Sequence, residues 1–233
     1  MKTFKTLLAA SALIALSATA AFAGGAGSDQ YGTWNDSSSQ GSGSQILNNQ
    51  INLQNNWSNL TGVVDTVGGD VVAQGSAAGN MIDVTTMNNT RVQNNQIVGA
   101  GATIGSNVSL DANNVWGSVG VQNQVLCNGA SVSTDPVLTA VHSNQECHAS
   151  DPYSGVSAYV TNVAGNAVFQ GSAISNSFEA DSNAPNMPIS SRQLNNSASV
   201  SNMNVAAGNV GGTVAMSSSA IGNTSQIIHY NTN

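Results

Sequence analysis

The amino-acid sequence predicts an all-β fold, a β-solenoid made of stacked coils rich in Asn, Ser and Gly. Three observations indicate it: apolar residues alternate with polar ones, segments of the chain repeat, and only 6% of the 233 residues are charged. Alternation with period two is typical of half-buried strands. An irregular β-sandwich is the alternative fold, because it would show the same alternation.

The alternation is clearest in three segments. Small apolar residues recur at alternate positions over residues 115–127, 156–162 and 198–202. Helical spacing is not sustained anywhere after residue 23. We therefore expect strands in the body of the chain.

Internal repetition is the stronger signal. Residues 67–80, 163–176 and 210–223 align without gaps, and their starts lie 96 and 47 residues apart. The spacing predicts a unit of about 48 residues, with one diverged copy near residues 115–127. The copies share one glycine, one serine and one asparagine at equivalent positions: Gly69, Ser76 and Asn80; Gly165, Ser172 and Asn176; and Gly212, Ser219 and Asn223.

Asn/Gln-rich segments accompany these copies, at residues 48–56, 92–96, 121–124 and 195–196. Each unit is therefore expected to hold one Asn/Gln strand and one Gly-Ser-Ala-Asn strand. Coils of roughly 22–24 residues would then give about eight coils and a stack of about 40 Å.

A stack of this kind explains the composition. Identical Asn side chains about 4.8 Å apart can donate to and accept from one another in ladders, whereas identical charges would repel. Glycine is expected at tight corners, where φ is positive or where backbones approach closely.

The two ends of the chain are expected to lie outside the repeats. Residues 1–23 resemble a cleavable secretory signal peptide, with Lys2 and Lys5 before an apolar run that ends in Ala21-Phe22-Ala23. This run is too short and too rich in Ser and Thr for a membrane-spanning helix, so we expect no membrane insertion. The expected organisation is a signal peptide (1–23), a flexible Gly/Ser-rich leader (24–45), a repeat-containing β domain (46–228) and a tail (229–233).

The charge of the exported chain limits its partners. Both lysines lie within residues 1–23, so Arg91 and Arg192 face eleven carboxylates and the net charge falls from −7 to −9. So few cations cannot neutralise a series of phosphates or hold the chain to anionic lipid. We therefore expect no nucleic-acid partner.

Cys127 and Cys147 are the only two cysteines. In an exported chain, two cysteines predict a disulfide. The bond is expected to close a loop of about 20 residues and to pin an insertion over residues 128–150. A zinc site made by both cysteines with His142 and His148 is the alternative, but the spacing matches no known zinc pattern.

No catalytic constellation is evident. The histidines His142, His148 and His229 lie in no frame such as G-x-S-x-G. The carboxylates near the repeats are not repeated from copy to copy; Asp70 is replaced by Asn166 and Thr213. We therefore expect no enzyme activity, no metal and no cofactor. A carbohydrate-binding or carbohydrate-cleaving β-helix is the alternative, and it would show Trp57, Trp116, Tyr153 or Tyr159 beside carboxylates such as Asp65, Asp83, Glu179 and Asp181.

Short motifs carry a resemblance to a known group of proteins. Gln74-Gly75-Ser76-Ala77 and Gln170-Gly171-Ser172-Ala173, with Asn166 four residues before Gln170, resemble the repeats of curlin-type functional amyloids and of holdfast-anchor surface proteins of stalked bacteria. The resemblance implies export to the cell surface and assembly into β-rich fibres or anchors for adhesion and biofilm. The implied partners are other copies of the chain or envelope anchor and secretion proteins, with polysaccharide as a further candidate.

Overall fold

The computed structural model describes residues 44–87, 89–134, 139–183 and 188–230. Within these residues there are twelve β-strands and no helix, which confirms the predicted all-β fold. The expected signal peptide, almost all of the expected leader and the last three residues of the tail lie outside the described residues. The expected start of the β domain is two residues late, because the first strand begins at Ser44.

The strands follow one another in groups of three, and each group forms one coil. The first coil holds β1 (Ser44–Asn52), β2 (Asn56–Val67) and β3 (Val71–Thr86); the second holds β4 (Thr90–Val98), β5 (Thr103–Val115) and β6 (Val119–Thr134); the third holds β7 (Thr139–Cys147), β8 (Ser150–Val163) and β9 (Ala167–Ser182); and the fourth holds β10 (Ile189–Asn195), β11 (Val200–Val210) and β12 (Val214–His229).

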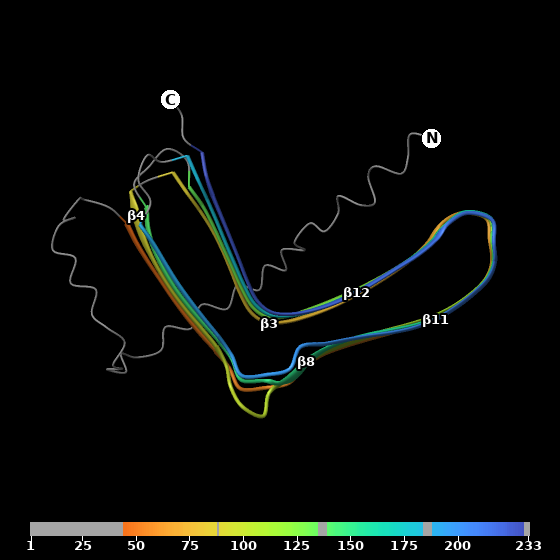
Figure 1. Cartoon of the computed structure of the whole chain (residues 1–233), viewed down its shortest axis with the longest axis horizontal. Coiled ribbons are helices and arrows are strands. Elements are labelled where there is room, and N and C mark those ends of the chain that lie inside the picture. Colours follow the sequence, from red (N-terminus) through yellow and green to blue (C-terminus); the bar gives the residue numbers. More distant parts are fainter. Residues whose placement is uncertain (1–43, 88, 135–138, 184–187, 231–233) are drawn as a thin grey trace. The chain divides into compact units, whose positions relative to one another are not determined.

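Corresponding strands stack into three parallel sheets. We call them the first sheet (β1-β4-β7-β10), the second sheet (β2-β5-β8-β11) and the third sheet (β3-β6-β9-β12). Figure 1 shows the coils superposed, strand over strand. The chain is thus a β-solenoid, as the repeats predicted.

The predicted coil length was wrong. One unit of about 48 residues forms a single coil, since Val71 pairs with Val119 and Val119 with Ala167. The described chain therefore has four coils and a stack of about 14 Å between its outermost strands, not about eight coils and about 40 Å. The prediction assigned two strands to each unit and omitted the strand between them, β2 and its counterparts, which has no repeated motif of its own.

The diverged copy lies where it was predicted, but two assignments beside it were wrong. Gln122, placed with the Asn/Gln strands, pairs with Gln74 and Gln170 in the third sheet. Residues 128–150 are not an insertion, because residues 128–134 complete β6 and residues 139–147 form β7 in regular register with β4. Weak alternation made this segment look irregular, although all three sheets continue through the second and third coils.

The apolar core lies between the third sheet and the other two. The strands of the third sheet have 16 residues each and bend part-way, so that they face the second sheet and then the first (Figure 1). Phe169 and Val108 are buried in the cluster against the second sheet, and Phe178 and Val92 in the cluster against the first. A third cluster, which contains both cysteines, fills the corner.

At the tip where the second sheet joins the third, the position with positive φ is an asparagine in three of the four coils and a threonine in the first. Thr66, Asn114, Asn162 and Asn209 have φ values of 57°, 55°, 54° and 52° at this turn. Asparagine tolerates this left-handed conformation better than most residues do. The Nδ2 of Asn209 donates to Asn162 Oδ1 at 3.0 Å, so the turns of adjacent coils are also linked by side chains.

Candidate functional site: amide ladders and open coil ends

Four asparagines, three of them buried and Asn223 of the last coil exposed, form a ladder along the bend of the third sheet. The Nδ2 of Asn80 donates to Asn128 Oδ1 at 3.0 Å, Asn128 donates to Asn176 at 2.8 Å, and Asn176 donates to Asn223 at 2.8 Å. Three of these residues were singled out by the repeats, and Asn128 is their counterpart in the diverged copy. The predicted asparagine ladder is therefore present, and all its bonds point from the first coil toward the last.

The same amides join the third sheet to the first. Asn80, Asn128 and Asn176 also donate to the backbone carbonyls of Ile97, Glu146 and Leu194, at 3.0, 3.0 and 2.8 Å respectively. A carbonyl can only accept, so these contacts fix which amide atom is the nitrogen. The direction of the ladder follows from this chemistry.

A second ladder, made of glutamines, faces the first. Gln96 donates to Gln50, Gln145 to Gln96, and Gln193 to Gln145, each at 2.9 Å. Each Nε2 also donates to a carbonyl of the third sheet, those of Met81, Gly129, Ser177 and Thr224. These bonds point from the last coil toward the first, opposite to the asparagine ladder. Sequence reasoning missed this column, although aligning the first strands of successive coils on Gln50 and Gln96 would have revealed it.

A third column contains the one arginine of the last coil. Asn144 donates to Asn95 at 2.8 Å and Asn95 to Asn49 at 2.9 Å, but the equivalent position of the fourth coil is Arg192. Arg192 donates to Asn144 Oδ1 and to Glu146 Oε1. This ladder therefore ends within the chain.

The carboxylate of Glu146 is held by several donors. Burial raises the pKa of Glu146, but hydrogen bonds from Arg192, His148 and Asn144 outweigh it, so the pKa lies below the ordinary value of 4.5. Glu146 is thus ionised at neutral pH and part of a structural ion pair.

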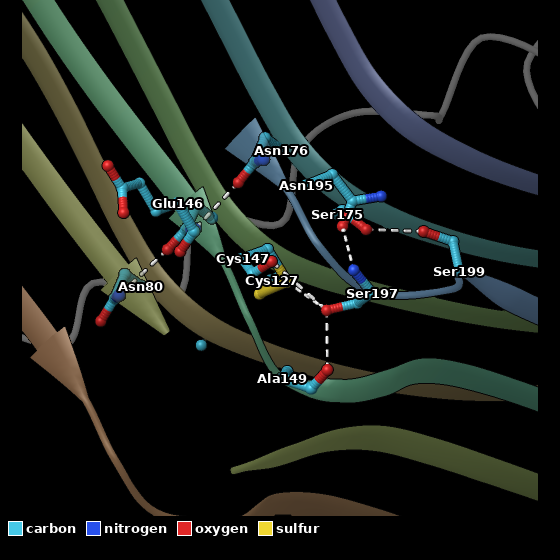
Figure 2. The surroundings of a disulfide bond; sticks show 12 residues. Asn80, Cys127, Glu146, Cys147, Ala149, Ser175, Asn176, Asn195, Ser197 and Ser199 are labelled. Carbon is cyan, nitrogen blue, oxygen red and sulfur yellow. Dashed lines mark hydrogen bonds between the residues drawn. A yellow bond between two sulfur atoms is a disulfide. The ribbon is translucent and has the colours of Figure 1, made fainter. Parts of the chain in front are cut away.

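The predicted disulfide joins Cys127 to Cys147, with a Cα–Cα distance of 6.1 Å. It links β6 of the second coil to β7 of the third, across the corner of the core. Figure 2 shows Ser197 of the fourth coil beside it; its hydroxyl donates to the carbonyls of Cys147 at 3.3 Å and Ala149 at 2.7 Å. The disulfide therefore links two successive coils covalently and does not hold an insertion in place.

The predicted glycines and serines have different roles. Gly69, Gly165 and Gly212 fall in one column with Gly117; a Cβ at Gly117 would lie 2.5 Å from the Gly69 carbonyl carbon, and one at Gly212 would lie 2.7 Å from Gly165 O. Close approach to the preceding coil, rather than positive φ, requires glycine at Gly117, Gly165 and Gly212. The serines Ser76, Ser172 and Ser219 also share a column, but none of them makes a side-chain hydrogen bond within the described residues.

Exposed apolar side chains gather in the first and last coils. Of the 16 large apolar residues exposed in the described part of the chain, only Trp116 and Tyr159 belong to the middle coils. Those of the end coils are Leu47, Ile51, Leu53, Trp57, Leu60, Val63, Val72 and Met87 in the first, and Leu194, Val200, Val214, Met216, Ile227 and Tyr230 in the last. The end coils thus expose apolar surface, and no further described strand pairs with their outer edges.

The residues considered for chemistry do not gather into a site. Among residues 44–87, 89–134, 139–183 and 188–230, no three His, Cys, Asp or Glu side chains are grouped to hold a metal. The cysteines of the alternative zinc site are bonded to each other. Nor does this part of the chain contain a helix long and apolar enough to cross a membrane.

Two of the aromatic residues considered for sugar binding do meet. Trp57 and Tyr153 stack with ring centroids 6.1 Å apart and an interplanar angle of 7°. Gly105 lies between them in the same column, and a Cβ there would overlap the Trp57 ring. The two rings thus cover the backbone that the glycine leaves bare, on the outer side of the second sheet.

Comparison with protein-family models, curated proteins and solved structures gave no match for the chain. The function of the chain is therefore inferred from the arrangement of its own residues.

Asn128→Asp should lower the free energy of unfolding by about 3 kcal/mol or more at neutral pH, because Asn176 Oδ1 and the Glu146 carbonyl lose their donor in a fully buried position. Urea denaturation measures the loss. Asn204→Asp adds the same charge at an exposed position of β11 and should change the value by less than about 0.5 kcal/mol. Equal effects of the two substitutions would contradict a structural role for the ladder.

Replacing both cysteines by alanine should lower the free energy of unfolding by about 3 kcal/mol, the value expected for a closed loop of this length. A reducing agent should lower the melting temperature of the wild-type protein and leave that of the double variant unchanged. A wild-type melting temperature insensitive to complete reduction would show that the clamp between coils adds nothing.

The lowered pKa of Glu146 predicts a pH-dependent stability. Because the folded pKa lies below the unfolded one, the stabilisation by this ion pair is present above about pH 4.5 and is lost as the pH falls through the folded value. Arg192→Gln should therefore be less stable than wild type at pH 7, and the difference should shrink below pH 4.5. Urea denaturation at several pH values tests this, with Glu146→Gln as the non-titrating control.

Proposed function

We propose that this chain is an exported structural protein of the bacterial cell surface, which self-associates through β-stacking as an adhesin or as a component of a biofilm or holdfast anchor. The observation that carries the proposal is that the in-register sheets, with the ladders of Asn80 and Gln50, run the full height of the described chain and stop at its first and last coils. The partners are other copies of the chain or envelope anchor and secretion proteins.

Open strand edges favour association. The outer edges of the first and last coils present rows of backbone donors and acceptors, and parallel strands satisfy such rows by pairing. Solenoid domains normally have end units with a polar outer face. The described end coils instead carry most of the exposed large apolar residues, so covering them would gain hydrophobic free energy as well as hydrogen bonds.

The disulfide and the composition agree with an extracellular setting. A disulfide that stabilises the fold persists in oxidising compartments. Neutral Asn, Ser and Gly columns can stack across a junction without the repulsion that repeated charges would produce.

Polysaccharide binding is a second candidate, favoured by the stacked pair Trp57 and Tyr153 on the outer side of the second sheet. Aromatic faces bind sugar rings, and Trp57 is 53% exposed. A protein that remained monomeric but bound glycans through this pair would fit this candidate.

The purified, oxidised chain should form ordered fibres during incubation at micromolar concentration. Negative-stain microscopy, thioflavin fluorescence and fibre diffraction with a reflection near 4.8 Å measure this. A protein that stays monomeric for days would refute self-association as its main role. Glycan-array binding with wild type and Trp57→Ala would then test the second candidate.

A further inference from the structure

We propose that copies of the chain stack head to tail with a single polarity, the last coil (β10–β12) of one copy pairing in parallel and in register with the first coil (β1–β3) of the next. This inference rests on the proposed function and specifies its interface. It predicts a polar fibre in which each junction repeats the contacts between coils inside the chain.

The two amide ladders leave complementary groups at the two ends. At the first coil, Asn80 Oδ1 accepts no hydrogen bond from a described residue, and Gln50 Nε2 uses one of its two hydrogens, on Met81 O. At the last coil, Asn223 Nδ2 has one contact, a 3.4 Å bond to Gln193 O, and Gln193 Oε1 accepts none within the described chain.

Head-to-tail stacking pairs all four groups. Asn223 of one copy would donate to Asn80 of the next, and Gln50 of the next copy would donate back to Gln193. Both bonds have the direction of their own ladder. Pairing of like ends would run the strands antiparallel and set unlike columns against one another.

The glycine column supplies an independent argument. Gly117, Gly165 and Gly212 must be glycine because a Cβ would strike the preceding coil, but a Cβ at Gly69 would meet nothing within 4 Å. Its φ is not in the left-handed region, so the fold of a single copy does not require glycine there. Stacking does require it, since the Cβ of Gly69 points to where Gly212 of the preceding copy would lie.

Apolar side chains also meet at the junction. Leu194 and Ile51 end one column, and Val200 and Trp57 end another; all four side chains are exposed. In the stack Leu194 would cover Ile51 of the next copy, and Val200 would cover Trp57. Each junction therefore buries apolar surface that a single copy leaves in water.

The distribution of carboxylates disfavours contact between like ends. The described residues of the first coil hold three carboxylates, Asp65, Asp70 and Asp83, and no cation, whereas residues 188–230 hold Arg192 and no carboxylate. Contact between two first coils would bring six carboxylates together, whereas head-to-tail contact places Asp65 and Asp83 against the neutral residues Gly208 and Gln226.

Two substitutions can block one end each. Gly69→Val fills the space that Gly212 of the preceding copy would need, and leaves the last coil unchanged. Val214→Pro removes a backbone N–H at the outer edge of the last coil. Ala167 occupies the equivalent position in the third coil, and its N–H donates to Thr213 O of the fourth coil at 2.9 Å. The N–H of Val214 therefore points toward the place of the next copy. Proline is tolerated at the start of an edge strand.

Matched controls exist for both positions. Gly68 also faces open space, but its counterparts Trp116 and Ala164 carry side chains within the stack, so Gly68→Ala should assemble like wild type. Val214→Ala keeps the N–H and should also assemble. Circular dichroism and melting temperature verify that each variant folds. If Val214→Pro unfolds, Met216→Pro replaces it, because Met216 lies two residues further along the same strand and its N–H points in the same direction.

The experiment is sedimentation velocity of the variants, alone and mixed. Gly69→Val and Val214→Pro should each remain monomeric at roughly tenfold or more above the concentration at which wild type assembles. An equimolar mixture of the two should form dimers and nothing larger, because each variant offers the end that the other lacks.

Three results would overturn the inference while the proposed function stands: assembly of Gly69→Val at the wild-type concentration, dimers of either blocked variant alone, or a monomeric mixture. A wild-type chain that never assembles would reject both.

Discussion

The structure depends on one constraint: parallel, in-register stacking places each residue over the residue one coil away. A residue type can repeat along the interior of such a column only if identical side chains can pack or hydrogen-bond to one another. Asn128 and Gln145 meet this condition because an amide both donates and accepts, and Gly117 meets it because it leaves the backbones room. A repeated charge does not, which explains why only 6% of the chain is charged.

The two ladders hold the sheets together as well as the coils. Each buried amide bonds along its column and across the corner to a carbonyl of the facing sheet, so Asn128 and Gln96 fix the distance between the first and third sheets. Leaving such a group unpaired in the interior is costly. The disulfide between β6 and β7 lies at the same corner and adds a covalent tie between coils.

The sequence was informative where columns repeat and uninformative where they do not. Repetition indicated the all-β stack, the asparagine column from Asn80 to Asn223 and the diverged copy. It could not indicate the coil length, because β2 and its counterparts have the alternation common to every strand and no motif. The glutamine column was hidden for a similar reason: Gln50 and Gln122 have similar neighbours but lie in different sheets.

The end coils have the same columns as the interior coils, and this similarity determines how the chain can associate. Gly117 leaves room for the first coil, and Gln96 donates to it. Gly69 and Gln50 could do the same for a coil stacked on the open side of the first coil. Within the described chain the column of Arg192 is an exception, because a cation there replaces an amide. Asn49 Oδ1 already accepts from Asn95, so the amide nitrogen of Asn49 is the group left for a further copy, and a guanidinium has no acceptor for it. That column therefore adds no ladder bond to a junction, and the direction of stacking is set by the asparagine and glutamine columns, whose donors at one end match acceptors at the other.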